Sequence, residues 1–125
     1  EITYGDWSSD VCSSDLADSA TDTFRELINS LIRLIIMSIE ARGDQVYTSM
    51  LLKQNWATFD EVLDTSEYIK KVSGIIQARV LEVKTALNSV YVNLFINKLV
   101  VAMCNQFLAS IYKIKRCNET SSHQF

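Results

Sequence analysis

The chain has 125 residues, carries a formal net charge of −3 and is 48% hydrophobic, with three glycines and no proline. A net charge so close to balance gives no basic footprint for nucleic-acid binding and no acidic tail. The one histidine, His123, leaves a histidine metal site, a catalytic triad or a histidine general base without partner residues.

The segment from Asp6 to Leu16 differs from everything after it. It is rich in serine and aspartate, lacks helical periodicity, and resembles the in-frame translation of an adapter used in short-read sequencing libraries. We therefore treat residues 1–16 as an artefactual, adapter-derived segment, predict that it is disordered, and exclude it from the fold. It holds four of the 15 acidic residues and none of the 12 basic ones, so residues 17–125 are close to neutral.

Residues 17–125 are expected to be a helical-bundle fragment that is truncated at both ends. Cys104 and Cys117 have no paired-thiol spacing and no preceding secretory signal, so reduced thiols are expected. Cys104 lies in an apolar helical run, where a free cysteine usually packs as a small hydrophobe.

The first predicted helix begins at Thr23, because Thr23 and Glu26 have the spacing of a capping box. Its apolar surface is wider than one stripe, so we expect neighbours on more than one side. The apolar positions are Phe24, Leu27, Ile28, Leu31, Ile32, Leu34, Ile35, Ile36 and Ile39. Residues 41–44 either end this helix or only loosen it before the apolar period continues to Leu52.

Residues 55–65 are the main interruption of the helical pattern. Trp56 and Phe59 are large aromatics in a connection, and such side chains tend to pin a connection to the core. Asp64 or Thr65 is expected to cap the next helix, with Glu67 in its first turn. That helix places an apolar series on one side, and its break falls near Gly74 or near Arg79. The series is Tyr68, Ile69, Val72, Ile75, Ile76 and Val80.

The last predicted helix extends from about residue 83 to residue 115 and would be about 50 Å long. It and the first helix are apolar enough to raise the question of membrane spanning. Arg33 interrupts the first, and polar residues interrupt the last at short intervals, so neither is expected to span. The polar residues of the last helix are Asn88, Asn93, Asn97, Lys98, Asn105 and Gln106.

Catalytic patterns are nearly absent from the sequence. No glycine-rich phosphate loop is present, and the adjacent carboxylates Asp60 and Glu61 have no polar pocket to define them. We therefore expect no enzyme, no cofactor and no metal site. Asn118-Glu119-Thr120 matches a glycosylation sequon, which we interpret as accidental because no secretory signal precedes it.

Lys113, Lys115 and Arg116 form the one local charge cluster, and they are the candidate interaction patch. One interpretation is that they complement the dipole at the end of the last helix, at about 0.3–1 kcal/mol for each exposed cation. The other is a patch for an acidic partner or for an anionic lipid surface, although three cations are fewer than such clusters usually have. The sequence favours the first interpretation.

The spacing of apolar and aromatic residues between about residues 20 and 125 resembles a known family. The matching series are Trp56-x-x-Phe59-x-x-Val62, Asp64-x-Ser66-x-Tyr68-Ile69, Tyr91-x-x-Leu94-Phe95-x-x-Lys98-Leu99, Phe107-x-x-x-Ile111-Tyr112-Lys113-x-Lys115 and Gln124. They resemble the C-terminal region of the vacuolar protein sorting fifty-three family. Members of this family are subunits of the Golgi-associated retrograde protein (GARP) complex and of its endosomal sister complex.

Apolar residues that recur at three and four, with no proline, predict an all-α fold, and the long helices favour an elongated bundle or rod of three to four long helices. The resemblance implies that this is a fragment of a larger helical tether. It implies a role in capturing endosome-derived vesicles at the trans-Golgi network. The implied location is cytoplasmic and peripheral at trans-Golgi and endosome membranes. The implied partners are other tether subunits, SNARE proteins and small GTPases, with no nucleic acid. Two alternatives stay open: an independent helical adaptor or regulatory bundle, and a subunit of another helical-rod tethering complex.

Overall fold

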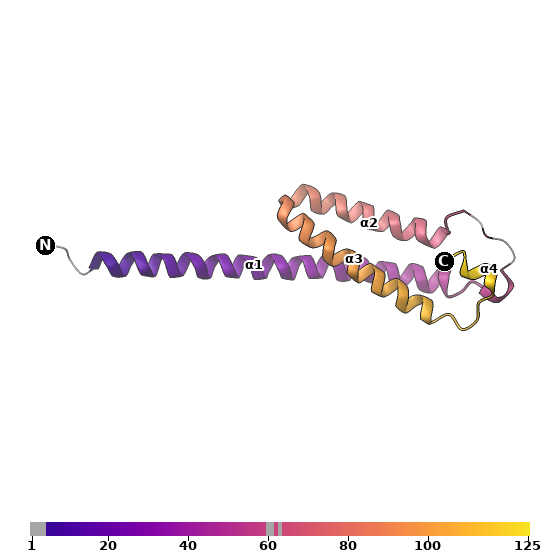
Figure 1. Cartoon of the computed structure of the whole chain (residues 1–125). Helices are drawn as coiled ribbons and strands as arrows, with labels where there is room; N and C mark the ends of the chain where they lie inside the picture. Colours follow the sequence, from indigo (N-terminus) through magenta and orange to yellow (C-terminus); the bar gives the residue numbers. More distant parts are fainter. Residues whose placement is uncertain (1–4, 60–61, 63) are drawn as a thin grey trace. The chain divides into compact units, whose positions relative to one another are not determined.

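The computed structural model describes residues 5–59, 62 and 64–125, with side chains from residue 14 onward. The regular elements of these residues are all helical, which confirms the all-α prediction (Figure 1). In chain order they are α1 (Gly5–Val46), the π-helical turn η1 (Tyr47–Leu51), the 3₁₀ turn η2 (Trp56–Thr58), α2 (Glu67–Ala86), α3 (Ser89–Tyr112) and the short α4 (Glu119–Ser122). The chain divides into two compact units, Glu1–Leu34 and Ile35–Phe125.

Helix α1 begins at Gly5, and the predicted start at Thr23 is wrong. The Thr23 hydroxyl donates instead to the carbonyl of Ser19, 2.9 Å away, because Ser19 already lies in the helix and leaves no free first-turn amides at Thr23. The backbone of residues 5–16 is helical where the sequence predicted disorder, since extending an existing helix costs far less than starting one. Leu16 is 71% exposed, and the exclusion of residues 1–16 from the packed fold stays a prediction.

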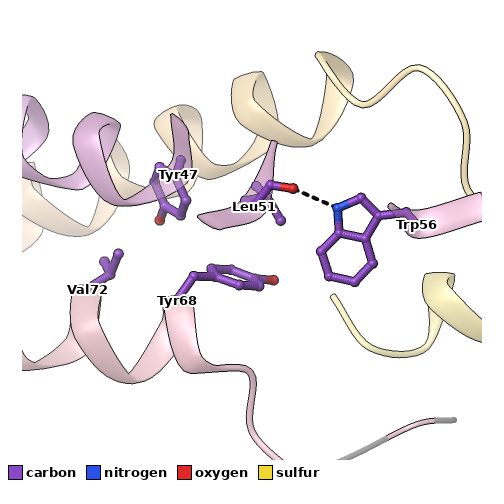
Figure 2. Close-up of a cluster of buried hydrophobic side chains, with 5 residues drawn as sticks. All are labelled: Tyr47, Leu51, Trp56, Tyr68 and Val72. Carbon is purple, nitrogen blue, oxygen red and sulfur yellow. Dashed lines mark hydrogen bonds between the residues drawn. The ribbon is translucent and has the colours of Figure 1, made fainter. Parts of the chain in front are cut away.

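The unit Ile35–Phe125 is built around an aromatic core. Tyr47, Leu51, Trp56, Tyr68 and Val72 are buried together, and Figure 2 shows how they meet. The Tyr47 and Tyr68 rings meet edge to face with centroids 6.2 Å apart, a favoured geometry for aromatic pairs. The core therefore joins η1, the connection and the start of α2.

Gly43 decides how closely α3 approaches the last turns of α1. A Cβ atom at Gly43 would lie 2.6 Å from the Oε1 of Gln106, so any larger residue would push this side chain away. From its present position the Gln106 amide donates to the carbonyl of Glu40, 2.5 Å away. Helix α1 therefore continues through residues 41–44. Gly43 lies inside it, and the absence of a side chain there leaves room for Gln106.

The connection between η1 and α2 is held by Trp56, as the sequence predicted. Trp56 is only 3% exposed, and its indole N–H donates to the carbonyl of Leu51, 2.7 Å away (Figure 2). Phe59 and Phe125 pack on the indole with ring centroids 5.3 and 4.7 Å away. A buried indole whose N–H is satisfied fixes both the position and the direction of the chain.

The C-terminal residues fasten the same connection from its other side. The Asn118 amide donates to the carbonyl of Phe59 at 2.8 Å, and its oxygen accepts from Ser121 N–H at 2.7 Å to cap α4. The Gln124 amide donates to the carbonyl of Asp64 and to the Ser66 hydroxyl, both at 2.9 Å. We call Asn118, Ser121, Gln124 and Phe125 the C-terminal clamp.

The N-cap of α2 is Ser66, so the predicted caps Asp64 and Thr65 are wrong. The Ser66 hydroxyl does not cap the helix, because it is engaged by the Gln124 side chain and donates to the Gln124 carbonyl at 3.0 Å. Glu67 occupies the first turn as predicted and pairs with Lys70 at 3.1 Å. Asp60 and Glu61 lie outside the described residues.

Helices α2 and α3 form an antiparallel hairpin whose turn is at Leu87 and Asn88 (Figure 1). Helix α2 continues through both predicted break points, and the predicted start of the last helix near residue 83 is wrong. The Asn88 side chain accepts from the Tyr91 amide at 3.2 Å, and this cap sets the start of α3. The 24 residues of α3 are about 36 Å long, shorter than the predicted 50 Å.

Candidate interaction surfaces

The basic cluster of Lys113, Lys115 and Arg116 lies at the C-terminal end of α3. Lys113 is the C-cap residue, and Lys115 and Arg116 lie in the connection to α4. All three side chains are exposed, and none forms an ion pair within the described residues. The helix dipole acts mainly over the last turn, so only Lys113 is placed to complement it, and Lys115 and Arg116 remain available to a partner.

A second surface lies on the part of α1 that belongs to the unit Glu1–Leu34. Its apolar side chains follow the a and d positions of a heptad repeat and are all exposed. The residues are Ala17, Ala20, Phe24, Leu27, Leu31 and Leu34, and we call them the α1 seam. Phe24, Leu27, Leu31 and Leu34 are 67%, 55%, 58% and 60% exposed, although residues of this kind prefer burial. An exposed a/d row is the surface with which helices pair in coiled coils and bundles.

The wide apolar face of this helix was predicted from the sequence, but the α1 seam was not. Its signal was the spacing of three and four between Phe24, Leu27, Leu31 and Leu34. The e positions hold Ile28 and Ile35, and no charged residue lies at an e or g position of these heptads. Charged e and g residues select partners in coiled coils, so partner choice at the α1 seam does not depend on such charges.

A third surface runs along the outer face of α3. Val90, Val101, Leu108 and Tyr112 recur at spacings that return to one side of the helix, and they are 70%, 61%, 51% and 86% exposed. We call these four residues the α3 stripe. Cys104 lies on the same face and is exposed, so the prediction that it packs as a core residue is wrong. The opposite side of α3 supplies the buried residues, which include Val92, Phe95 and Leu99.

Helix α3 is long and apolar enough to cross a membrane by length and composition alone. That the helix does not span a membrane stays a prediction. Asparagine and glutamine add little charge, and Lys98 is the one charged residue between Ser89 and Tyr112. Only 22% of its most apolar window is buried within the protein. The helix thus combines high hydropathy with a surface that the rest of the chain leaves mostly uncovered.

Next to the α3 stripe, α2 and α3 enclose an apolar groove. Residues Ile76 and Val80 form the α2 wall, and no polar surface lines the groove. The α3 wall consists of Ile96, Leu99, Val100, Met103 and Cys104. A second hollow, with a volume of about 280 Å³, lies beside Trp56 and the clamp residue Gln124. Its polar groups largely satisfy one another, as the bonds between Ser66 and Gln124 show.

Among the described residues, the two core tyrosines have shifted pKa values. Burial raises the pKa of the Tyr47 hydroxyl above its ordinary value of 10, with smaller contributions from Tyr68 and Cys104. Burial also raises the pKa of Tyr68, and the nearby Ser66 hydroxyl lowers it by a smaller amount. The Tyr68 hydroxyl has no hydrogen-bond partner that meets ordinary distance and angle limits. Their ionisation therefore opposes folding, and they serve the core.

No constellation for catalysis emerges from the residues that the structure describes. Within them, no group of His, Cys, Asp and Glu side chains could hold a metal ion. His123 is the exposed C-cap residue of α4. The side-chain amide of the sequon residue Asn118 donates to the carbonyl of Phe59, which favours a structural role for this residue over glycosylation.

The chain is similar to a curated protein of Arabidopsis thaliana named vacuolar protein sorting-associated protein 53 A. The two are 23% identical over 103 residues, which cover 82% of this chain and 12% of the relative. The chain thus spans about an eighth of the length of the curated relative that it matches. No family model matches the chain. No solved structure matches it either.

Proposed function

We propose that this chain is part of a multisubunit vesicle-tethering complex in endosome-to-Golgi retrograde transport and acts through protein contacts, without catalysis. The similarity to a vacuolar protein sorting-associated protein supports this proposal across most of the chain. The all-α fold is compatible with it, because helical bundles assemble through apolar helix faces.

The α1 seam is the observation that carries the proposal. Six a and d positions in a row are exposed, and four of them hold Phe or Leu. Burying one such side chain is worth about 1.5–3 kcal/mol, so a partner helix that covered all four would gain a large part of a typical binding free energy. The seam therefore suits assembly with helices of other subunits.

Within this proposal the protein is cytoplasmic and peripheral at trans-Golgi and endosome membranes. Its first partners are the other tether subunits, and SNARE proteins and small GTPases are further candidates. The basic cluster is available for a partner that carries negative charge, because its side chains are exposed and unpaired within the described residues.

Co-expression with the other tether subunits tests the proposal. We expect the tagged chain to co-purify with them and the double variant Leu27→Asp, Leu31→Asp to lose them, because charges at a and d positions prevent helix packing. Leu81→Asp is the matched control, since Leu81 is 66% exposed on α2, outside the seam. It should retain the subunits.

A different result would contradict the tethering role. If the unmodified chain co-purifies with none of the subunits and remains a stable monomer, it is an independent helical adaptor. If the double variant still assembles fully, the seam is not the assembly surface.

A further inference from the structure

We propose that the α3 stripe, together with the basic cluster at its end, docks on a bilayer surface that contains anionic lipid. The proposal goes beyond the tethering role, because it assigns a direct lipid contact to one helix of this chain. It rests on the juxtaposition of an open apolar face and unpaired cations within the unit Ile35–Phe125.

The apolar part of the surface is the stripe itself. Val90, Val101, Leu108 and Tyr112 share one side of α3, and each is at least 51% exposed. Tyr112, at 86%, is the most exposed of them and directly precedes the basic cluster. Tyrosine is enriched where membranes meet water, because its ring is apolar and its hydroxyl is polar.

The charge of this region matches an anionic surface. Residues 65–125 contain eight Lys and Arg residues against three acidic ones. Two of the three acids, Glu67 and Glu82, are paired with Lys70 and Arg79. No acidic residue lies in α3, so nothing on the stripe repels anionic headgroups. Cations next to an apolar face add electrostatic attraction to hydrophobic insertion.

The other arrangements fit less well. A spanning α3 would take Lys98 and several amide side chains into hydrocarbon, and it would break the bond of Gln106 to Glu40. Pairing of two copies through the stripe would supply the cations with no partner from α3 itself, because no acidic residue lies in that helix. A bilayer surface leaves the buried side of α3 intact and satisfies the cations.

Vesicle sedimentation of the full chain, without other subunits, tests the proposal. We expect binding to vesicles of phosphatidylcholine with phosphatidylserine and little binding to phosphatidylcholine alone. Each cation near such a surface contributes about fivefold, so the triple variant Lys113→Gln, Lys115→Gln, Arg116→Gln should bind about a hundredfold more weakly. The matched control is Arg42→Gln, Lys53→Gln, Lys71→Gln, which removes three exposed cations elsewhere and should lose less than about fivefold.

The stripe has its own readout. With Cys12→Ser and Cys117→Ser, a polarity-sensitive dye on the exposed Cys104 should shift to the blue when vesicles with phosphatidylserine are added. The control carries the same dye at Leu81→Cys, in a chain with Cys12, Cys104 and Cys117 replaced by serine. Its emission should not shift. Val101→Asp should weaken binding, and the control Leu81→Asp should not.

Three results would overturn the proposal. They are equal binding with and without phosphatidylserine, equal losses in the two triple variants, and vesicle binding that leaves the dye on Cys104 unchanged. If Val101→Asp loses a tether subunit and keeps vesicle binding, the stripe is a protein interface. The seam variant Leu27→Asp, Leu31→Asp should bind vesicles normally, which separates this proposal from the tethering role.

Discussion

The apolar side chains of the two units differ in their exposure. In Glu1–Leu34 the apolar a and d residues of α1 are exposed, whereas in Ile35–Phe125 the aromatic side chains from η1, η2 and α2 are buried together. Apolar spacings of three and four residues occur in both units, as between Phe24 and Leu27 and between Tyr68 and Val72. The difference teaches that periodicity marks a surface suited to packing, while the presence of a neighbour decides whether that surface is a core or an interface.

The largest effect is expected at the centre of the packed unit. Trp56→Ala should lower the free energy of unfolding by about 3–5 kcal/mol, because it leaves a cavity and an unpaired carbonyl at Leu51. Urea unfolding followed by circular dichroism measures this change. Leu81→Ala, at an exposed leucine, should change it by less than about 0.5 kcal/mol. A loss below about 1 kcal/mol for Trp56→Ala would remove Trp56 from the core.

A smaller effect is expected at the C-terminal clamp. Asn118→Ala should cost about 1–2 kcal/mol, because it removes the cap of α4 and the bond to the Phe59 carbonyl. The variant should also be cut faster by protease between residues 113 and 125. Asn105→Ala, at an exposed asparagine of α3, is the control and should leave both measurements nearly unchanged. Equal protease sensitivity in the two variants would show that the clamp does not hold.

The packed unit should also lose stability at alkaline pH. The pKa values of Tyr47 and Tyr68 are raised on folding, so their contribution is fully present below the unfolded value of about 10 and is lost as pH rises through the folded values. Melting temperatures between neutral pH and pH values above 10 measure the loss. The double variant Tyr47→Phe, Tyr68→Phe should lose less stability over that range. An identical slope would mean that other groups cause the loss.

The smallest effect is expected in the other unit. Deletion of residues 1–16 should change the free energy of unfolding of Ile35–Phe125 by less than about 0.5 kcal/mol, because Leu16 and the described residues beside it are exposed. The matched comparison is deletion of residues 118–125, which removes the clamp and should destabilise the protein clearly. A marked loss from the first deletion would show that the segment takes part in packing.

Much of the fold followed from local pattern. Apolar spacing and the absence of proline predicted an all-α chain, and Trp56 was predicted to pin the connection because a large aromatic in a polar stretch seldom stays exposed. The helix ends were predicted less well. The caps at Thr23, Asp64 and Thr65 failed because capping signals are short, and the chain offered stronger partners elsewhere.

The candidate surfaces divide in the same way. The basic cluster was visible as three cations within four residues, and its role stays a prediction. The α1 seam and the α3 stripe were hidden within apolar runs, because the sequence does not state which side of a helix a neighbour covers. Cys104 is an example, since it lies in an apolar run and is nevertheless exposed on the outer face of α3.

The sequence by itself determined that the chain is helical, that its charge is nearly balanced beyond residue 16, and that Trp56 anchors a connection. These properties depend on side-chain chemistry and on spacing within one helix or one connection. Only the tertiary structure decided that Gly43 admits Gln106, that Gln124 takes the Ser66 hydroxyl away from capping, and which apolar faces remain open. These features join residues about 60 positions apart, and no local pattern encodes contacts at that separation.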